Sequence, residues 1–145
     1  MKQRGFTLIE VIVVLALAGI IYMILLAVPM RGGSSSDLKA SARTLASGLR
    51  QAQSTAMATK RDAVLLVDVE SRQFQMPGDK QARNLPDGID LKLYTAQSEI
   101  TGDKRGAIRF YPDGSSTGGR ITVASGERKL LVDVDWLTGR VSIND

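Results

Sequence analysis

Residues 1–30 have the sequence MKQRGFTLIEVIVVLALAGIIYMILLAVPM, and the placement of charge in this stretch indicates which kind of N-terminal segment the chain has. No charged residue occurs from Val11 to Met30. An α-helix of this length extends about 30 Å, which is the thickness of the hydrocarbon core of a bilayer. Glu10 interrupts the apolar character near the start. An acidic side chain at the centre of a membrane span costs about 2.5–3.5 kcal/mol, so Glu10 needs a partner or a function.

Three kinds of N-terminal segment fit parts of this pattern. A secretory signal peptide fits the positive charges of Lys2 and Arg4 and the small residues that end at Ala18. Glu10 would interrupt its apolar region, however, and cleavage after Ala18 would leave the apolar residues 20–26 at the new terminus. A plain membrane anchor with a cytoplasmic N-terminus explains the charge bias but not the glutamate.

The third kind of segment accounts for the glutamate as well. Residues 2–10, KQRGFTLIE, resemble the leader and mature start of type IV pilin-like proteins. The resemblance implies a leader over residues 1–5, which a membrane peptidase removes by cutting after Gly5, and methylation of the new N-terminal Phe6. It also implies a transmembrane and assembly helix over residues 6–30. In that family the glutamate at the position of Glu10 pairs with the N-terminal amine of its own or a neighbouring subunit during assembly.

A second, amphipathic helix is predicted over residues 31–61. Pro29 and the glycines at 32–33 interrupt the apolar helix, and Ser36 is the expected N-cap with Asp37 in the first turn. An apolar stripe and a polar face then follow. The stripe recurs at spacings of three and four and favours a helix packed on a sheet, with a coiled coil as the alternative. The stripe is Leu38, Ala42, Leu45, Leu49, Ala52 and Ala56, and the polar face carries Lys39, Arg43, Arg50 and Gln53.

Residues 62–145 are predicted to form an antiparallel β domain. Apolar residues alternate there in short runs separated by turn signals such as Pro86-Asp87-Gly88. The sequence LLVDV occurs at 65–69 and again at 130–134, which indicates two similar strands of one domain. The predicted class is α+β, a long N-terminal helix packed on an antiparallel β-sheet domain. The predicted strands are 63–69, 73–76, 89–94, 107–111, 120–124, 129–135 and 140–143.

Enzymatic chemistry is not expected. Residues 114–118, GSSTG, match the spacing of a hydrolase nucleophile elbow, but that site needs a histidine base and the chain contains no histidine. Nor does a Lys-Ser/Thr pair follow the glycines, as a phosphate-binding loop would require. Asp133 and Asp135, with Asp113, are the minority alternative for a cation site, because calcium needs six or more oxygen ligands and the rest of an EF-hand is missing. We therefore expect no catalytic residue, no cofactor and no metal.

Two groups of residues are candidates for contact with partners. A glycine-rich loop over residues 113–119 suits a binding surface, because its glycines adopt backbone angles that other residues avoid; the alternative is an ordinary hairpin connection. Four basic residues near the C-terminus are expected to be ordinary hairpin charges, with DNA contact as the alternative. The loop consists of Asp113, Gly114, Ser115, Ser116, Thr117, Gly118 and Gly119, and the basic residues are Arg120, Arg128, Lys129 and Arg140.

Two motifs in the C-terminal half indicate which group of pilin-like proteins the chain resembles. Residues 110–121, FYPDGSSTGGRI, and 134–141, VDWLTGRV, resemble the central motif and the closing hairpin of the H-type minor pseudopilins of type II secretion. The resemblance implies a single-pass protein of the bacterial inner membrane with a cytoplasmic N-terminus and a periplasmic β domain. It implies a structural subunit near the filament tip, which links the tip subunits to the major pseudopilin for export of folded proteins across the outer membrane.

The same resemblance implies which partners the chain has. They are the other minor pseudopilins, the major pseudopilin, the prepilin peptidase and the inner membrane, together with secreted substrates. The alternative function is that of a minor pilin of a type IV pilus that binds DNA in natural competence. Nucleic acid is the less expected partner, because the chain has no concentrated basic stripe. Salt-dependent binding of duplex DNA would distinguish the two functions.

Overall fold

The computed structural model describes residues 7–27, 34–102 and 104–145, and it divides into two compact units, residues 1–30 and 31–145. The predicted cleavage site at Gly5 and Phe6 lies outside the described residues. The predicted interruption at Pro29 and at the glycines 32–33 lies outside them as well.

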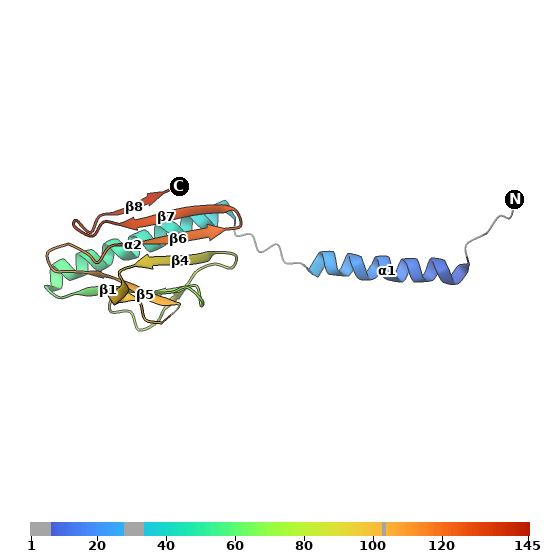
Figure 1. Ribbon diagram of the computed structural model, residues 1–145, viewed down its shortest axis with the longest axis horizontal. Helices are drawn as coiled ribbons and strands as arrows, with labels where there is room; N and C mark the ends of the chain where they lie inside the picture. Colours follow the sequence, from blue (N-terminus) through green and yellow to red (C-terminus); the bar gives the residue numbers. More distant parts are fainter. Residues whose placement is uncertain (1–6, 28–33, 103) are drawn as a thin grey trace. The chain divides into compact units, whose positions relative to one another are not determined.

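The first unit contains helix α1, Leu8–Ala27 (Figure 1). The backbone amide of Glu10 donates to the carbonyl oxygen of Thr7 at 3.0 Å, so Glu10 lies in the first turn. Acidic side chains are favourable at this end of a helix, where the free amide groups leave partial positive charge. Among the described residues, no helix combines the length and hydropathy expected of a membrane span.

The second unit begins with helix α2, Ser35–Thr59, whose N-cap is Ser34. The Ser34 hydroxyl accepts from the Asp37 amide at 3.1 Å, and the Asp37 carboxylate accepts from the Ser34 amide at 3.0 Å. The prediction that Ser36 caps the helix is therefore wrong. A cap at Ser34 places Asp37 at the third helical position, the place from which a carboxylate reaches back to the capping residue.

The apolar stripe of α2 is confirmed as the side that packs. Its six residues are at most 4% exposed, and they contact strands of the same unit. The helix also buries Ser41, Ala46 and Gly48 beside the stripe. Because small side chains dominate this face, the helix backbone lies close to the sheets, and the alternative of a coiled coil is not needed to bury the stripe.

The strands form two four-stranded antiparallel sheets with the orders β3-β2-β1-β5 and β4-β6-β7-β8. The two LLVDV segments occupy β1 and β7, so they lie in different sheets. Neither β3 nor the short 3₁₀ helix η1 was predicted from the sequence. The elements are β1 Ala63–Asp68, β2 Gln73–Gln75, β3 Arg83–Asn84, β4 Asp90–Thr95, η1 Gln97–Glu99, β5 Arg105–Phe110, β6 Gly119–Ser125, β7 Arg128–Val134 and β8 Val141–Asn144.

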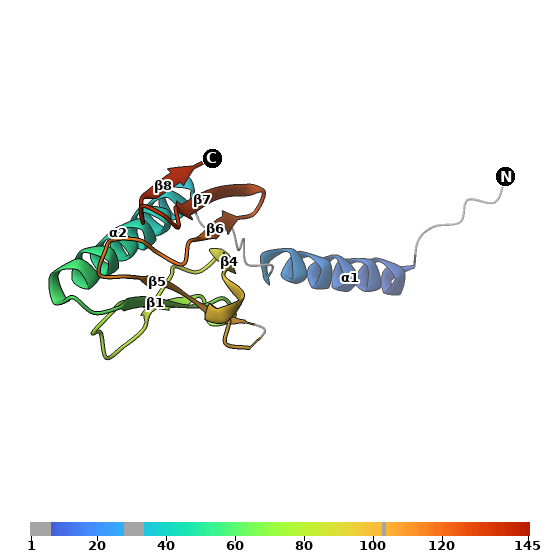
Figure 2. The ribbon, with the colours of Figure 1, turned by 60° about the vertical axis from the view of Figure 1, so that its left-hand side comes forward.

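The core of the second unit lies where both sheets meet α2. Figures 1 and 2 show α2 running alongside strands of both sheets. Phe74 and Phe110 from the first sheet and Ile121 and Val123 from the second are fully buried there together with Leu45 of the helix. The predicted α+β class is confirmed. The faces of the two sheets that point away from this core carry polar residues. They also carry the surface that is the candidate for contact with partners.

Candidate interaction surface

The glycine-rich loop connects β5 to β6 and is folded on itself at its start. The Gly114 amide donates to the Tyr111 carbonyl oxygen at 2.9 Å, which closes a turn. The amide and the hydroxyl of Ser115 both donate to the Asp113 carboxylate, at 2.9 and 2.6 Å. These two hydrogen bonds, the one from the hydroxyl first, lower the pKa of Asp113.

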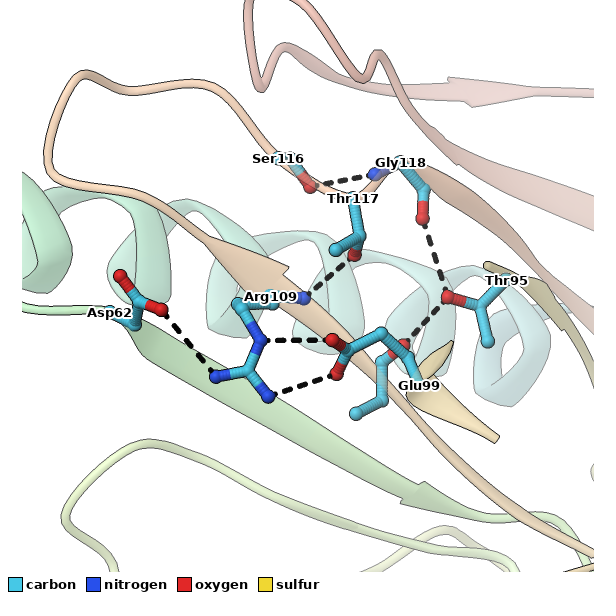
Figure 3. Close-up of polar contacts among 8 residues, drawn as sticks. Asp62, Thr95, Glu99, Arg109, Ser116, Thr117 and Gly118 are labelled. Carbon is cyan, nitrogen blue, oxygen red and sulfur yellow. Dashed lines mark hydrogen bonds and ion pairs between the residues drawn. The ribbon is translucent and has the colours of Figure 1, made fainter. Parts of the chain in front are cut away.

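The second half of the loop is tied to its surroundings. The Ser116 amide donates to the Trp136 carbonyl oxygen at 2.8 Å. The Gly118 amide donates to the Ser116 hydroxyl at 3.0 Å, and the Arg109 amide donates to the Thr117 hydroxyl at 3.1 Å (Figure 3). The Thr117 amide donates in turn to the Arg109 carbonyl oxygen at 2.9 Å. Gly118 has a φ of +71°, and a Cβ there would lie 2.9 Å from the Trp136 Cβ, which explains the glycine. Of the seven loop residues, all of them described, Asp113 alone is exposed.

A partly buried ion pair lies beside this loop. The Arg109 guanidinium holds the Glu99 carboxylate at 2.9 and 3.3 Å and approaches Asp62 at 3.6 Å (Figure 3). The hydrogen bonds to Glu99 raise the pKa of Arg109, so the guanidinium stays charged. The Thr95 hydroxyl adds a bond of 2.7 Å to the Ala107 carbonyl oxygen. Together these contacts fix η1 and the end of β4 against β5.

An open groove of about 950 Å³ lies next to these contacts. Its lining includes Thr117 and Gly118 of the loop and three exposed apolar residues from other segments. These are Tyr94 at 80% exposed, Trp136 at 66% and Ile100 at 50%. Large exposed aromatic side chains around a concave surface are typical of protein interfaces, where Trp and Tyr contribute most of the binding energy. The groove is therefore the best candidate for a contact surface.

The turn that carries Trp136 is built around Asp135. Its carboxylate accepts hydrogen bonds from the Leu137 amide at 3.1 Å and from the amide and the hydroxyl of Thr138, each at 2.8 Å. These bonds, the one from the Thr138 amide first, lower the pKa of Asp135. The Gln53 side chain of α2 donates to the carbonyl oxygens of Gly114 and Thr138, at 2.8 and 2.9 Å. Gln53 thus joins the loop and the turn.

The Asp135→Asn substitution is expected to lower the free energy of unfolding at pH 7. It should also remove part of the decrease in that free energy as the pH falls. The folded pKa of Asp135 lies below the unfolded value of about 3.9, so its contribution is present above that pH. The contribution disappears as the pH falls through the folded pKa. Urea unfolding of residues 31–145 between pH 7 and pH 2 should therefore show the two proteins converging below about pH 4.

The matched control is Asp90→Asn. Asp90 is exposed on β4, and its side chain makes no hydrogen bond or ion pair with the residues that the structure describes. Its substitution should leave the curve of stability against pH close to that of the wild type. A constant difference between Asp135→Asn and the wild type from pH 7 to pH 2 would contradict the assigned role of the carboxylate.

The four basic candidates are not gathered into one patch. Arg120 pairs with Asp133 across the β6–β7 ladder, and Arg120 and Arg140 line the groove. Arg128 and Lys129 lie at the opposite end of the same hairpin, beside its turn. The structure therefore separates them into two pairs, of which one is partly neutralised. Contact with DNA through these four residues stays an untested alternative.

The remaining candidates are dispersed or lie outside the described part. Glu10 is in α1, and Gly5 and Phe6 are among the residues that are not described. Sequence reasoning missed Tyr94 and Glu99 because residues 70–105 contain no motif. Trp136 belongs to residues 134–141, which indicated the family and not a contact surface. An aromatic residue at an outward position of an alternating strand, as Tyr94 is, was the one signal available for this surface.

Comparisons with known proteins match most of the chain. The family model described as type II transport protein GspH matches residues 41–138, which is more than half of the chain. The prokaryotic N-terminal methylation motif matches residues 1–27. A curated relative from Xanthomonas campestris pv. campestris, "Type II secretion system protein H", is 31% identical over 140 residues, which cover 97% of this chain and 82% of the relative.

Solved structures share the fold. The type IV minor pilin FimU of Pseudomonas aeruginosa has a TM-score of 0.55 at 12% identity, with 76% of this chain and 90% of that chain covered. The minor pseudopilin EpsH from the type 2 secretion system of Vibrio cholerae has a TM-score of 0.54 at 17% identity, with 74% and 95% covered. At these identities the likeness shows the fold alone. The match to the family model and the curated relative confirm the resemblance found in the sequence, and the chain belongs to the family of type II transport protein GspH.

Proposed function

We propose that the chain is a minor pseudopilin of a type II secretion system. It would act near the tip of the pseudopilus as a structural subunit that joins the tip subunits to the major pseudopilin. The observation that carries the proposal is the relative named "Type II secretion system protein H", which matches almost the whole chain. The family is structural, and the absence of histidine and cysteine from the chain agrees with a role in assembly and not in catalysis.

The N-terminal segment supports a matching location and maturation. The match of residues 1–27 to the methylation motif supports cleavage after Gly5 and methylation of Phe6. The uncharged run from Val11 to Met30 supports an anchor in the inner membrane, with the N-terminus in the cytoplasm. Residues 31–145 would then lie in the periplasm, where the neighbouring subunits and secreted proteins meet them.

Secretion in a clean deletion strain tests the proposal. We expect exoenzyme to accumulate in the periplasm and to be lost from the medium, while twitching and DNA uptake continue. Expression of the full chain from a plasmid should restore secretion. Normal secretion together with failed twitching or DNA uptake would contradict the proposal and would assign the chain to a type IV pilus.

The groove is the surface that we assign to contact with neighbouring subunits. Trp136→Ala is expected to weaken incorporation by about 2 kcal/mol or more, because exposed aromatic residues at interface centres contribute that much. Folding should persist, since the side chain is 66% exposed. The measurement is the amount of the variant that copurifies with affinity-tagged major pseudopilin, relative to the amount in the membrane.

Leu66→Ala serves as the matched control for the groove. Leu66 is a large apolar side chain that is 48% exposed, but it lies on β1 in the other sheet and does not line the groove. The control should copurify as the wild type does. Equal copurification of Trp136→Ala and Leu66→Ala would remove the groove from the assembly surface and leave the rest of the proposed function standing.

A further inference from the structure

Helix α2 carries charge of one sign on its exposed side. The one acidic residue of the helix, Asp37, belongs to the capping box at its start. From residue 38 to residue 61 no aspartate or glutamate occurs, and the charged residues are Lys39, Arg43, Arg50, Lys60 and Arg61. A surface helix that folds alone usually mixes both signs, because pairs three or four residues apart stabilise it. This pattern indicates that the opposite charge comes from elsewhere.

Two of these basic residues lie one turn apart near the start of the helix. The side chains of Lys39 and Arg43 are exposed, and neither side chain makes a hydrogen bond or an ion pair with any residue that the structure describes. Arg50 is different, because its guanidinium donates to the Val141 carbonyl oxygen at 3.1 Å. Several arginines elsewhere in the unit do have acidic partners, among them those in the pairs Arg83–Asp79, Arg105–Asp68, Arg109–Glu99 and Arg120–Asp133.

Arg43 also borders an open depression of about 270 Å³ between α2 and the segment around β3. On the helix side the lining is polar, with Thr44, Ser47 and Gln51, and on the other side are Met76 and Arg83. Gly48 forms part of the same lining, and a Cβ there would lie 3.2 Å from Leu65 Cδ1, so the helix lies close to β1 at this point. The depression is rich in hydrogen-bond donors. The acidic residue nearest in sequence to its β3 side, Asp79, already forms an ion pair with Arg83 at 3.0 Å.

We propose that this part of α2, the basic face formed by Lys39, Arg43 and Ser47, docks an acidic segment of a neighbouring subunit in the filament. An arginine holds a carboxylate through two parallel hydrogen bonds, and such charge-assisted bonds are about twice as strong as neutral ones. The small residues Ala40 and Ser47 on the exposed side allow another backbone to come close. The inference rests on the proposed role in assembly, and it adds the chemistry of the partner.

The number and arrangement of the charges favour a protein partner. Binding to an anionic lipid surface takes clusters of about 4–8 basic residues, and nucleic-acid binding takes an extended basic stripe. The basic face offers two unpaired cations beside a depression of limited size. That arrangement suits one or two carboxylate side chains presented by a folded neighbour.

Site-specific crosslinking in cells that assemble the filament tests the inference. The photoreactive residue p-benzoylphenylalanine replaces Ser47 in the full chain, and mass spectrometry locates the crosslinked residue. We expect it to fall on a neighbouring subunit within a segment that bears aspartate or glutamate. Arg43→Glu should lower the crosslink yield about tenfold, the loss expected for one charge-assisted bond. Reversing the acidic partner residue to lysine in the Arg43→Glu background should restore the yield.

Matched variants separate charge from folding. Arg43→Lys keeps the charge but not the two parallel hydrogen bonds, so its yield should lie between those of the wild type and Arg43→Glu. Lys92→Glu reverses an exposed charge on β4 in the other part of the unit and should leave the yield unchanged. A crosslink to lipid, to nucleic acid or to a segment without acidic residues would overturn the inference. So would a normal yield with Arg43→Glu, or a yield that charge reversal on the partner fails to restore.

A second crosslinking position distinguishes this inference from the proposed function. The same photoreactive residue in place of Val14, an exposed residue of α1, reports whether the chain assembles with other subunits at all. Crosslinks from position 14 without any from position 47 would refute the docking face and leave assembly intact. The absence of crosslinks to other subunits from both positions would refute the assembly role and the docking face together.

Discussion

Gly139→Ala is expected to lower the free energy of unfolding of residues 31–145 by about 3 kcal/mol or more. Gly139 has a φ of +62°, in the left-handed region, where an alanine costs about 1–2 kcal/mol. A Cβ at this position would also collide with the Gly114 carbonyl oxygen and the Gln53 amide nitrogen. These two atoms are joined by a hydrogen bond, so the collision would disrupt the contact between α2, the loop and the turn. Urea unfolding at pH 7 measures the loss.

Gly126→Ala is the control that separates backbone strain from collision. Gly126 has a φ of +59°, close to that of Gly139, but no atom lies within 4 Å of the position that its Cβ would take. We expect a loss of about 1–2 kcal/mol there, the cost of the left-handed conformation alone. In the Gly139→Ala background, Gln53→Ala should cost little more, because the bond from Gln53 is already displaced. Equal losses for the two glycine variants would show that the junction is not tightly packed.

The sequence was most informative where one physical pattern determines one element. The apolar stripe of α2 at spacings of three and four predicted a helix and its buried side, because burial of that side is what stabilises the helix. Alternation predicted the longer strands for the same reason. The N-cap was misplaced by two residues, because Ser34, Ser35 and Ser36 are chemically equal and the distance to Asp37 decides among them.

The division into two sheets and the position of the groove were not predictable in this way. β1 and β7 share the LLVDV sequence, yet which strand pairs with which depends on contacts between residues far apart in the chain. The candidate loop was found through its glycines. Its neighbours Tyr94 and Trp136 come from other segments, and the groove exists because Glu99 and Arg109 hold η1 beside β5. Such a site is a property of the tertiary structure.

Glu10→Ala is expected to leave the subunit in the membrane and to abolish its incorporation into the filament. After cleavage at Gly5, the cationic amine of Phe6 would lie four residues before Glu10, and hence one helical turn away. Removing one partner of a buried ion pair costs about 3–5 kcal/mol, which corresponds to a factor of about 10² to 4 × 10³ in the equilibrium of incorporation. The measurement compares the subunit in purified filaments with the subunit in total membranes by immunoblot.

Two further variants determine whether charge is the reason. Glu10→Gln has nearly the same shape without the charge and should fail as Glu10→Ala does, whereas Glu10→Asp keeps the charge and should be incorporated in part. Membrane levels should not fall for Glu10→Ala, because removing a carboxylate from an apolar segment favours insertion. Incorporation of Glu10→Ala at the wild-type level would refute the ion pair, and α1 would then have to be interpreted as a plain anchor whose glutamate has another role.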